Sequence, residues 1–240
     1  MLIYGINPVL EALRAKRATL VRVSPRADDR LTAVVRLAEQ QGVAVQRVSA
    51  GELDRLAAGV RHRHQGVIGD VEETRTYGVE DLVIGATQAP LIVVLDSLED
   101  PYNVGAILRT VDAAGGDGVV RQSRHAARLD GAAANASAGA VAHVKIAEVV
   151  NIARAIDILK DAGVWTVGLA GDAPKRYDEI DLRLPTAIVV GAEGTGLRRL
   201  VRERCDWLVS IPMAGHVQSL NVSVATGIAL FEAVRQRTRK

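Results

Sequence analysis

The chain has 240 residues, of which 48% are hydrophobic, 3% aromatic and 24% charged, and its formal net charge is +2. This composition excludes a disordered chain, and the single cysteine, Cys205, excludes internal disulfides and a multi-cysteine metal site. No apolar run approaches the roughly 18 residues of a membrane span, and the first residues, Met1 to Gly5, do not have the pattern of a signal peptide. We therefore expect a globular cytosolic protein whose core is built from aliphatic side chains.

The charge is unevenly distributed along the chain. Residues 1–69 carry 11 Arg/Lys against 6 Asp/Glu, a net charge of +5, which leaves −3 for the remainder. A basic front segment on a nearly neutral protein points to a polyanionic partner. A solvated basic face without a partner explains the charge equally well.

Residues 1–70 have the pattern of a small α/β unit. Asn7 precedes Pro8 at a predicted helix start, because proline is favoured at the first position of a helix. Ser49 is placed to cap another helix, with Glu52 at the capping-box position. Between them we expect strands at 20–23 and 43–48 and a helix at 31–41 that ends at Gly42.

Residues 71–88 are polar and mixed, so we interpret them as a linker with one helix near 80–84. From Pro90 onward, apolar runs alternate with helical stretches, and this order predicts a parallel sheet covered on both faces. The predicted strands are 91–95, 118–120, 164–169, 187–190 and 208–211, and the predicted helices are 104–114, 152–162, 197–203 and 219–237. Ligands of such sheets bind outside the carboxyl ends of the strands, which points to three loops, 96–105, 191–196 and 211–221.

The first loop holds an asparagine and an arginine at a predicted helix start. Asn103 occupies the expected N-cap position, and Arg109 follows six residues later, so that both can face the same end of the sheet. A buried arginine near a helix start is unfavourable for the helix dipole, and an anionic ligand accounts for it better than folding does. The alternative is an ion pair of Arg109 with an acidic neighbour, namely Asp96, Glu99 or Asp100.

The second loop is rich in glycine. Gly191, Gly194 and Gly196 allow a ligand to approach the backbone closely, although a tight turn explains the same glycines. The loop lacks the pattern of a dinucleotide site and the lysine of a Walker motif. Glu193 places a carboxylate there, which suits a cationic or hydroxyl-bearing ligand better than a phosphate.

The third loop is a polar turn that leads directly into a long helix of small apolar residues. The turn contains Ser219 and Asn221, and the helical stretch follows at once. A core or dimer-interface position explains the small residues of the helix but leaves Ser219 and Asn221 unexplained. We therefore expect a ligand pocket at the helix start.

Three other features carry less weight. Residues 61–64 (Arg-His-Arg-His) form a basic cluster with a metal-like histidine spacing, but no cysteine or carboxylate lies nearby in the sequence. Contact with RNA phosphate, or a plain loop, is the better interpretation. His125 and His143 are isolated and receive no functional role, and Cys205 is interpreted as a small half-buried residue.

Three segments in chain order resemble the three motifs of the SPOUT superfamily, in the branch of the TrmH-like RNA ribose 2′-O-methyltransferases. They are Asn103–Thr110, Ile188–Leu197 and Ile211–Ser223. The front segment, with Tyr4–Leu13 and His64–Val67, is similar to the ribosomal-protein-like RNA-binding domain of the bacterial 23S rRNA (guanosine-2′-O-)-methyltransferases. Because the tRNA guanosine branch usually lacks that domain, the resemblance favours rRNA over tRNA.

The resemblance implies an α/β fold in three parts. These are a small α/β RNA substrate-binding domain at 1–70, a linker at 71–88, and at 89–240 a SPOUT methyltransferase domain with a parallel sheet and a deep trefoil knot. It also implies S-adenosylmethionine as cofactor, bound in a bent form, and RNA as partner, while the residues themselves lead us to expect no metal. The residues carried over for cofactor binding are Gly191, Gly194, Ile211, Met213, Ser219 and Leu220. Those for the reacting site are Asn103, Arg109, Glu193, Ser219 and Asn221, and Ser137 and Gly139 match a further Ser-x-Gly-Ala segment.

The chain departs from the family pattern in two places. His216 and Gln218 stand where many relatives have a basic or small residue and an acidic one, and residues 121–125 (Arg-Gln-Ser-Arg-His) lack the usual Pro-Lys start. We expect both departures to affect RNA contacts more than donor binding. Two alternatives stay open, a tRNA ribose 2′-O-methyltransferase and a non-catalytic RNA-binding or ribosome-assembly protein, and the intact reacting residues oppose the second.

The resemblance also carries a mechanism. A ribose 2′-hydroxyl attacks poorly until its proton is removed, whereas the methyl donor needs only in-line placement. The family proposal makes Arg109 either the base or the anchor of the adjacent phosphate, with Asn103 and Glu193 holding Arg109 or the ribose. Since arginine is effectively always protonated, we favour the anchor, with a phosphate oxygen assisting proton removal.

Two expectations concern the partners of the chain. The many small apolar residues of the last helix, together with the family precedent, predict a homodimer. Aromatic residues for base stacking are scarce, at 3% of the chain. We therefore expect RNA recognition through arginine side chains and RNA shape.

Overall fold

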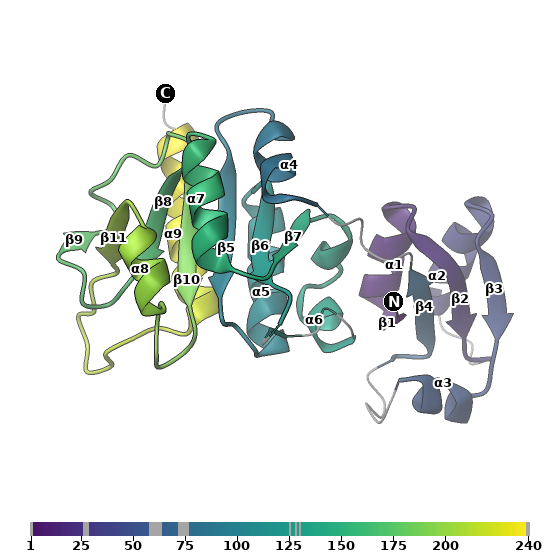
Figure 1. Ribbon diagram of the computed structural model, residues 1–240. Helices are drawn as coiled ribbons and strands as arrows, with labels where there is room; N and C mark the ends of the chain where they lie inside the picture. The colour runs from purple at the N-terminus through teal and green to yellow at the C-terminus, as the bar shows by residue number, and fades with distance from the viewer. Residues whose placement is uncertain are drawn as a thin grey trace.

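The computed structural model describes residues 2–25, 29–57, 64–71, 77–124, 126, 127, 129 and 131–238. These residues form two separate β-sheets. The first has four strands in the order β1-β4-β2-β3, and the second has seven in the order β7-β6-β5-β10-β8-β11-β9. Figure 1 shows the smaller sheet beside the end of the larger one that carries β7 and α6.

The front sheet is mixed. β2 pairs in parallel with β3 and antiparallel with β4, and β4 pairs antiparallel with β1. Ser49 caps α3 as predicted, since its side chain accepts a hydrogen bond from the Glu52 amide at 3.3 Å. The elements are β1 (Leu2–Tyr4), α1 (Ile6–Arg14), β2 (Ala18–Val23), α2 (Asp29–Gln40), β3 (Ala44–Arg47), α3 (Ala50–Leu56) and β4 (Val67–Val71), of which β1 and β4 were not predicted.

All pairings in the larger sheet are parallel, which confirms the predicted sheet type. Its strands are β5 (Leu91–Asp96), β6 (Gly118–Gln122), β7 (Ile146–Val149), β8 (Trp165–Leu169), β9 (Lys175–Arg176), β10 (Thr186–Gly191) and β11 (Trp207–Ser210). Its helices are α4 (Val79–Ile84), α5 (Pro101–Ala113), α6 (Gly131–Ala136), α7 (Ile152–Asp161), α8 (Arg199–Arg204) and α9 (Val222–Thr238), with a 3-10 turn at Ala140–Ala142. The five predicted strands and four predicted helices are present, whereas β7, β9 and α6 were missed.

Two layers of helices bury the larger sheet. α5 and α9 pack on one face and share a core with side chains of β5, β10 and β11. α4, α7 and α8 contribute to the core on the other face. Every residue of β5 is buried, as expected of a central parallel strand. α4 lies where a linker helix was predicted, and its Leu82 is wholly buried in this second core.

The two sheets are joined by a contact between α1 and the segment around the 3-10 turn. Arg17 Nη1 donates hydrogen bonds to the carbonyl oxygens of Val141 and Ala142, at 3.3 and 2.9 Å. His143, expected to be isolated, instead lies with Nε2 3.3 Å from the Glu11 carboxylate. Gly139 has a φ of +94°, and a Cβ added there would lie 2.5 Å from the Glu11 Cβ. Only glycine permits this backbone conformation and this close approach together.

The His64 side chain has a local structural role. It is buried, its Nε2 lies 3.2 Å from Asp54 Oδ1, and its Nδ1 accepts a hydrogen bond from the Gly66 amide at 3.0 Å. The other three members of the predicted basic cluster, Arg61 to Arg63, lie outside the described residues. Across the residues that the structure describes, no group of three or more His, Cys, Asp or Glu side chains is arranged to hold a metal ion.

Cys205 is half-buried after α8, as predicted. Its thiol donates a hydrogen bond to the Val201 carbonyl at 3.3 Å, and burial raises its pKa to about 12. None of the helices in the described ranges combines the length and the apolar character that crossing a membrane requires.

Candidate active site

A cavity of about 1080 Å³ opens at the carboxyl ends of β8, β10 and β11. Three loops surround it, and they follow these strands at 170–172, 191–197 and 210–222. The position agrees with the rule that ligands of parallel sheets bind at this edge. All six residues that the resemblance assigns to the cofactor line the cavity: Gly191, Gly194, Ile211, Met213, Ser219 and Leu220.

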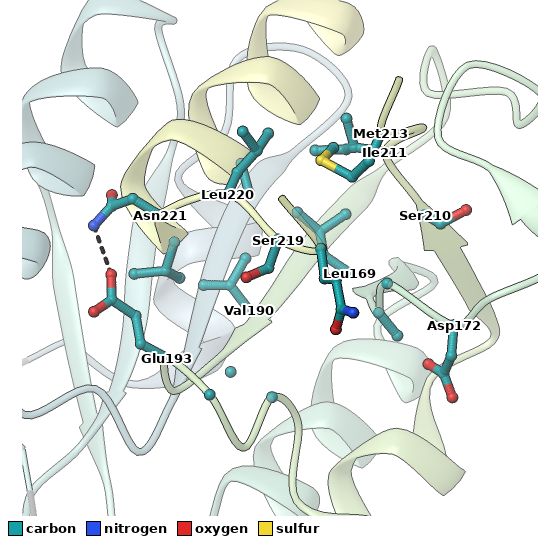
Figure 2. A pocket seen from close by; sticks show the side chains of 18 of the residues that line it. Leu169, Asp172, Val190, Glu193, Ser210, Ile211, Met213, Ser219, Leu220 and Asn221 are labelled. Atoms are coloured by element: carbon teal, nitrogen blue, oxygen red, sulfur yellow. Dashed lines mark hydrogen bonds between the residues drawn. The ribbon is translucent and has the colours of Figure 1, made fainter. Parts of the chain in front are cut away.

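The wall of the cavity combines apolar and polar side chains. Figure 2 shows Leu169, Val190 and Ile211 among the side chains around its centre, with Glu193 on one side and Asp172 on the other. A concave cavity in which apolar side chains and placed polar groups converge suits a small molecule that has surfaces of both kinds.

Asp172 was not identified as a site residue from the sequence. Asp172 forms an ion pair with Arg202, another residue of the cavity wall. Arg202 donates two parallel hydrogen bonds to the Asp172 carboxylate, at 2.8 and 2.9 Å. These bonds hold the pKa of the Asp172 carboxyl below its usual value. Asp172 follows β8, so the strand-end rule could have found it, had it been applied to that strand as well.

Gly191 is required by the packing of its own loop. A Cβ added at Gly191 would lie 2.1 Å from the carbonyl carbon of Gly196, so no side chain fits there. The loop closes through a backbone hydrogen bond from Gly196 to Ala192 at 2.9 Å. The tight-turn interpretation of these glycines therefore holds, and the turn places Glu193 at its exposed tip.

Three polar side chains, one from the first turn of α5 and two from loops, meet at one side of the cavity. Asn221 Nδ2 donates to Asn103 Oδ1 at 2.9 Å and to Glu193 Oε1 at 2.5 Å. Asn103 Nδ2 donates to the same Glu193 oxygen at 3.2 Å. Asn221 is held in turn by the start of α9, since its Oδ1 accepts from the Ser223 amide at 2.9 Å. We call Asn103, Glu193 and Asn221 the amide–carboxylate cluster.

The placement of Asn103 at an N-cap was wrong. The N-cap of α5 is Asp100, whose side chain accepts a hydrogen bond from the Tyr102 amide at 3.0 Å, and Pro101 is the first helical residue. Asn103 therefore lies in the first turn of α5, and its side chain is buried against the two other members of the cluster.

The expectations for Arg109 are partly wrong as well. Arg109 lies in the third turn of α5 and is exposed, so the argument from a buried arginine at a helix start does not apply. It is also not among the residues that line the cavity. Within the part of the chain that the structure describes, Arg109 has no ion pair with Asp96, Glu99 or Asp100. Asp96 instead binds Arg198, whose Nη2 lies 2.6 Å from its Oδ1.

Ser219, His216 and Gln218 also line the cavity, whereas Ser137 and Gly139 do not. Ser219 lies near its centre in Figure 2. His216 and Gln218 belong to the same wall and are exposed. Their position places them on the side expected for the donor, which gives no support to the idea that they bear mainly on RNA.

Two family models match the chain. The SpoU rRNA methylase family matches residues 90–231. The family described as RNA 2′-O ribose methyltransferase substrate binding matches residues 2–77. Together these matches cover both sheets.

Similar proteins agree with these matches. A Burkholderia protein named 23S rRNA (guanosine-2′-O-)-methyltransferase RlmB is 44% identical over 243 residues, which cover 100% of this chain and 98% of that protein. A Pseudomonas syringae protein of the same name is 42% identical, with 99% of this chain and 96% of that protein covered. The AdoMet-bound rRNA methyltransferase of Sinorhizobium meliloti is 28% identical with a TM-score of 0.82, covering 99% of this chain and 88% of its own. The chain therefore belongs to the SpoU rRNA methylase family.

Proposed function

We propose that the protein transfers a methyl group from S-adenosylmethionine to the ribose 2′-hydroxyl of a guanosine in 23S rRNA. Family membership and the names of the two full-length relatives support the reaction and the substrate. The observation in this chain that carries the proposal is the meeting of Asn103, Glu193 and Asn221 beside a cavity of about 1080 Å³.

The cavity suits S-adenosylmethionine in size and chemistry. Pockets for molecules of drug size measure about 300–1,000 Å³, so a nucleoside joined to an amino acid has room here. The apolar side chains of Leu169, Val190 and Ile211 suit an adenine ring, and the exposed carboxylate of Glu193 favours a cation. We infer that the cofactor is held by Gly191, Gly194, Ile211, Met213, Ser219 and Leu220.

The amide–carboxylate cluster has the task of orienting the ribose. When bound, S-adenosylmethionine supplies a methyl group activated by a positively charged sulfur. The 2′-oxygen gains this methyl, the carbon–sulfur bond breaks with its electrons on sulfur, and the hydroxyl proton leaves to a phosphate oxygen or water. Asn103, Glu193 and Asn221 already fix one another by hydrogen bonds, so they can align the attacking oxygen with little further loss of freedom.

Arg109 is proposed to anchor the phosphate next to the target ribose. Its guanidinium stays charged at any physiological pH and offers a planar pair of donors that match a phosphate. Its exposure, and its lack of an ion pair with the acidic residues near it, support this role. Asn103 lies on the same helix, and together they would place the sugar and its phosphate.

A homodimer is part of the proposal. Val224 and Phe231 of α9 are 50% and 49% exposed, and Val217 in the loop before α9 is 65% exposed. Val224 and Phe231 are seven residues apart, so they lie on the same side of the helix. Large apolar side chains on one helix face are typical of a surface that another protein covers. Sedimentation of the purified protein should give twice the monomer mass, and Phe231→Glu should shift it to the monomer.

Three further expectations stay part of the proposal. We keep the division into a substrate-binding domain at 1–70, a linker at 71–88 and a methyltransferase domain at 89–240, which the two separate sheets support. We also keep the trefoil knot, which the resemblance to the SPOUT superfamily implies. A cytoplasmic location follows from a substrate in the ribosome.

The test is a methylation assay on defined RNAs. 23S rRNA from cells that lack the gene is incubated with the purified protein and labelled S-adenosylmethionine, with bulk tRNA in a parallel reaction. We expect one methylated guanosine ribose in 23S rRNA and none in tRNA. Label in tRNA alone would establish the tRNA alternative, and donor binding without any transfer would establish the non-catalytic one.

A further inference from the structure

The turn between β5 and α5 has an unusual backbone conformation. Ser97, the first residue after β5, has a φ of +62°. Residues with a side chain seldom adopt this left-handed region, because Cβ then crowds the backbone. Ser97 therefore needs contacts that hold it there, and the turn leads to Asn103 six residues later.

Gln122 provides such contacts from the end of β6. Its Oε1 accepts a hydrogen bond from the Ser97 amide at 3.0 Å and another from the Ser97 hydroxyl at 3.2 Å. The Gln122 residue is only 7% exposed, so few water molecules can replace it. One buried oxygen thus binds both polar groups that the left-handed conformation of Ser97 presents.

The segment that follows Gln122 also forms a hydrogen bond with this turn. The Ala127 amide donates to the Leu98 carbonyl at 3.1 Å. The neighbouring residue Arg121 donates through Nη2 to the Ala127 carbonyl, and its Nε lies 3.6 Å from the Glu148 carboxylate. Burial lowers the pKa of the Arg121 guanidinium, and the nearby Glu148 opposes that shift.

The turn is also held by Arg198, the N-cap residue of α8. Asp96, which is 0% exposed, accepts hydrogen bonds from the backbone amide of Arg198 at 2.8 Å and from its Nε at 2.7 Å. The Asp96–Ser97–Leu98 segment is therefore fixed by two separate parts of the chain, and Asp100, two residues after Leu98, is the N-cap of α5. These contacts leave the first turn of α5, and Asn103 within it, little room to move.

We propose that Gln122 is a positioning residue for methyl transfer, because it locks Ser97 and so sets the place of Asn103 in the amide–carboxylate cluster. This inference rests on the proposed function, since it assigns Gln122 to the same reaction. Gln122 lies in residues 121–125, the segment that lacks the usual Pro-Lys start of the family.

The test replaces Gln122 by a side chain of the same shape that accepts no strong hydrogen bond. Gln122→Met should slow single-turnover methylation at saturating RNA and donor by about tenfold or more, as expected when a reacting group moves by a fraction of an ångström. Donor affinity, measured by calorimetry, should stay within about twofold, because no cavity-lining residue belongs to this turn. Adding Ser97→Gly should restore much of the rate, because glycine needs no support at a positive φ.

A matched control separates positioning from general stability. Gln236 makes the same kind of bond, since its Oε1 accepts from the Leu182 amide at 2.8 Å, but neither residue contacts the cavity or the cluster. Gln236→Met should lower the melting temperature without changing the single-turnover rate. Equal rate losses in the two variants would overturn the proposal, as would an unchanged rate in Gln122→Met.

A double-mutant cycle tests the route through Asn103. In an Asn103→Ala background, Gln122→Met should have almost no further effect on the rate, whereas independent effects would multiply and overturn the proposal. Hydrogen exchange at residues 97–103 gives a readout that needs no activity, and Gln122→Met should speed it. If the unaltered protein methylates no RNA, the proposed function fails. Independently of that result, an unchanged hydrogen-exchange rate at residues 97–103 in Gln122→Met would refute the role of Gln122 in holding Ser97.

Discussion

The donor side and the RNA side of the reacting centre differ in how completely one chain builds them. On the donor side, loops of this chain enclose a formed cavity, and Asn103, Glu193 and Asn221 bind one another at the edge where the cavity meets the proposed ribose site. On the RNA side, Arg109 of α5 is exposed, and among the described residues it forms no ion pair with Asp96, Glu99 or Asp100.

The difference follows from what each side has to bind. A small cofactor can be enclosed by loops of one chain, and side chains that fix one another lose little entropy when it binds. The phosphate of a large RNA arrives from outside. An arginine already paired with a carboxylate would have to break that ion pair before it could bind the phosphate. The contrast predicts that substitutions on the two sides affect donor binding and turnover differently.

The largest effect is expected at Arg109. Arg109→Ala should reduce methyl transfer by at least about a hundredfold, because the phosphate and ribose lose their placement. Donor affinity measured by calorimetry should hardly change, since Arg109 does not line the cavity. Arg109→Lys keeps the charge but loses the planar pair of donors, so its methyl-transfer rate should lie between those of the unaltered protein and Arg109→Ala. Equal turnover in the alanine variant would end the anchoring hypothesis.

A substitution in the cluster should weaken both sides. Asn221→Asp replaces two donated hydrogen bonds by a second carboxylate facing Glu193, and like charges at this distance repel. We expect donor affinity and single-turnover rate each to fall by about tenfold. Ser223→Ala, which removes only a contact to Asn221 Oδ1, serves as the control. Wild-type donor affinity in Asn221→Asp would show that the cluster does not form part of the donor site.

The junction between the two domains can be tested through Gly139. Gly139→Ala forces a left-handed alanine and brings its Cβ to 2.5 Å from the Glu11 Cβ. Gly163→Ala is the matched control, since Gly163 has a φ of +79° but nothing within 4 Å of the added atom. Backbone strain alone should cost about 1–2 kcal/mol of unfolding free energy in the control. Urea unfolding should show a larger loss of unfolding free energy for Gly139→Ala than for Gly163→Ala. Equal losses would mean that α1 does not pack against Gly139.

The smallest effect concerns how the front domain presents RNA. Arg17→Met removes the two hydrogen bonds to Val141 and Ala142. Arg22→Met removes the same charge but only an ion pair with Asp70 inside the front sheet. We expect the RNA KM to rise about threefold more in Arg17→Met than in Arg22→Met, with donor affinity unchanged in both. The same KM in the two variants would show that the domain contact does not assist RNA binding.

Much of the larger sheet could be predicted because its strands carry their signal locally. β5 and β10 are continuous apolar runs, which is the pattern of buried parallel strands. β7 was missed because its four residues, Ile-Ala-Glu-Val, are short and mixed. The start of α5 was misplaced by three residues although Asp100-Pro101 is a good helix start, because Asn103 competes as a cap.

The site could be located from the sequence but not assembled. The rule on strand ends and the family resemblance pointed to the loops of Asn103, Glu193 and Asn221, and the family matches confirm the resemblance. That these three side chains bind one another depends on the order of strands, which no local pattern contains. Asp172 was missed because the strand-end rule was not applied to β8, and its pairing with Arg202, 30 positions later, is not contained in any local pattern. The catalytic roles and the trefoil knot stay predictions.

The state of Cys205 has a practical consequence. A half-buried thiol whose pKa is raised to about 12 is almost fully protonated near neutral pH, and a protonated thiol reacts slowly with alkylating reagents. The chain has no second cysteine. Exposed cysteines introduced into each domain can therefore carry a pair of fluorophores while the natural residue stays in place. Energy transfer between the dyes would follow the spacing of the two domains as RNA is captured and released.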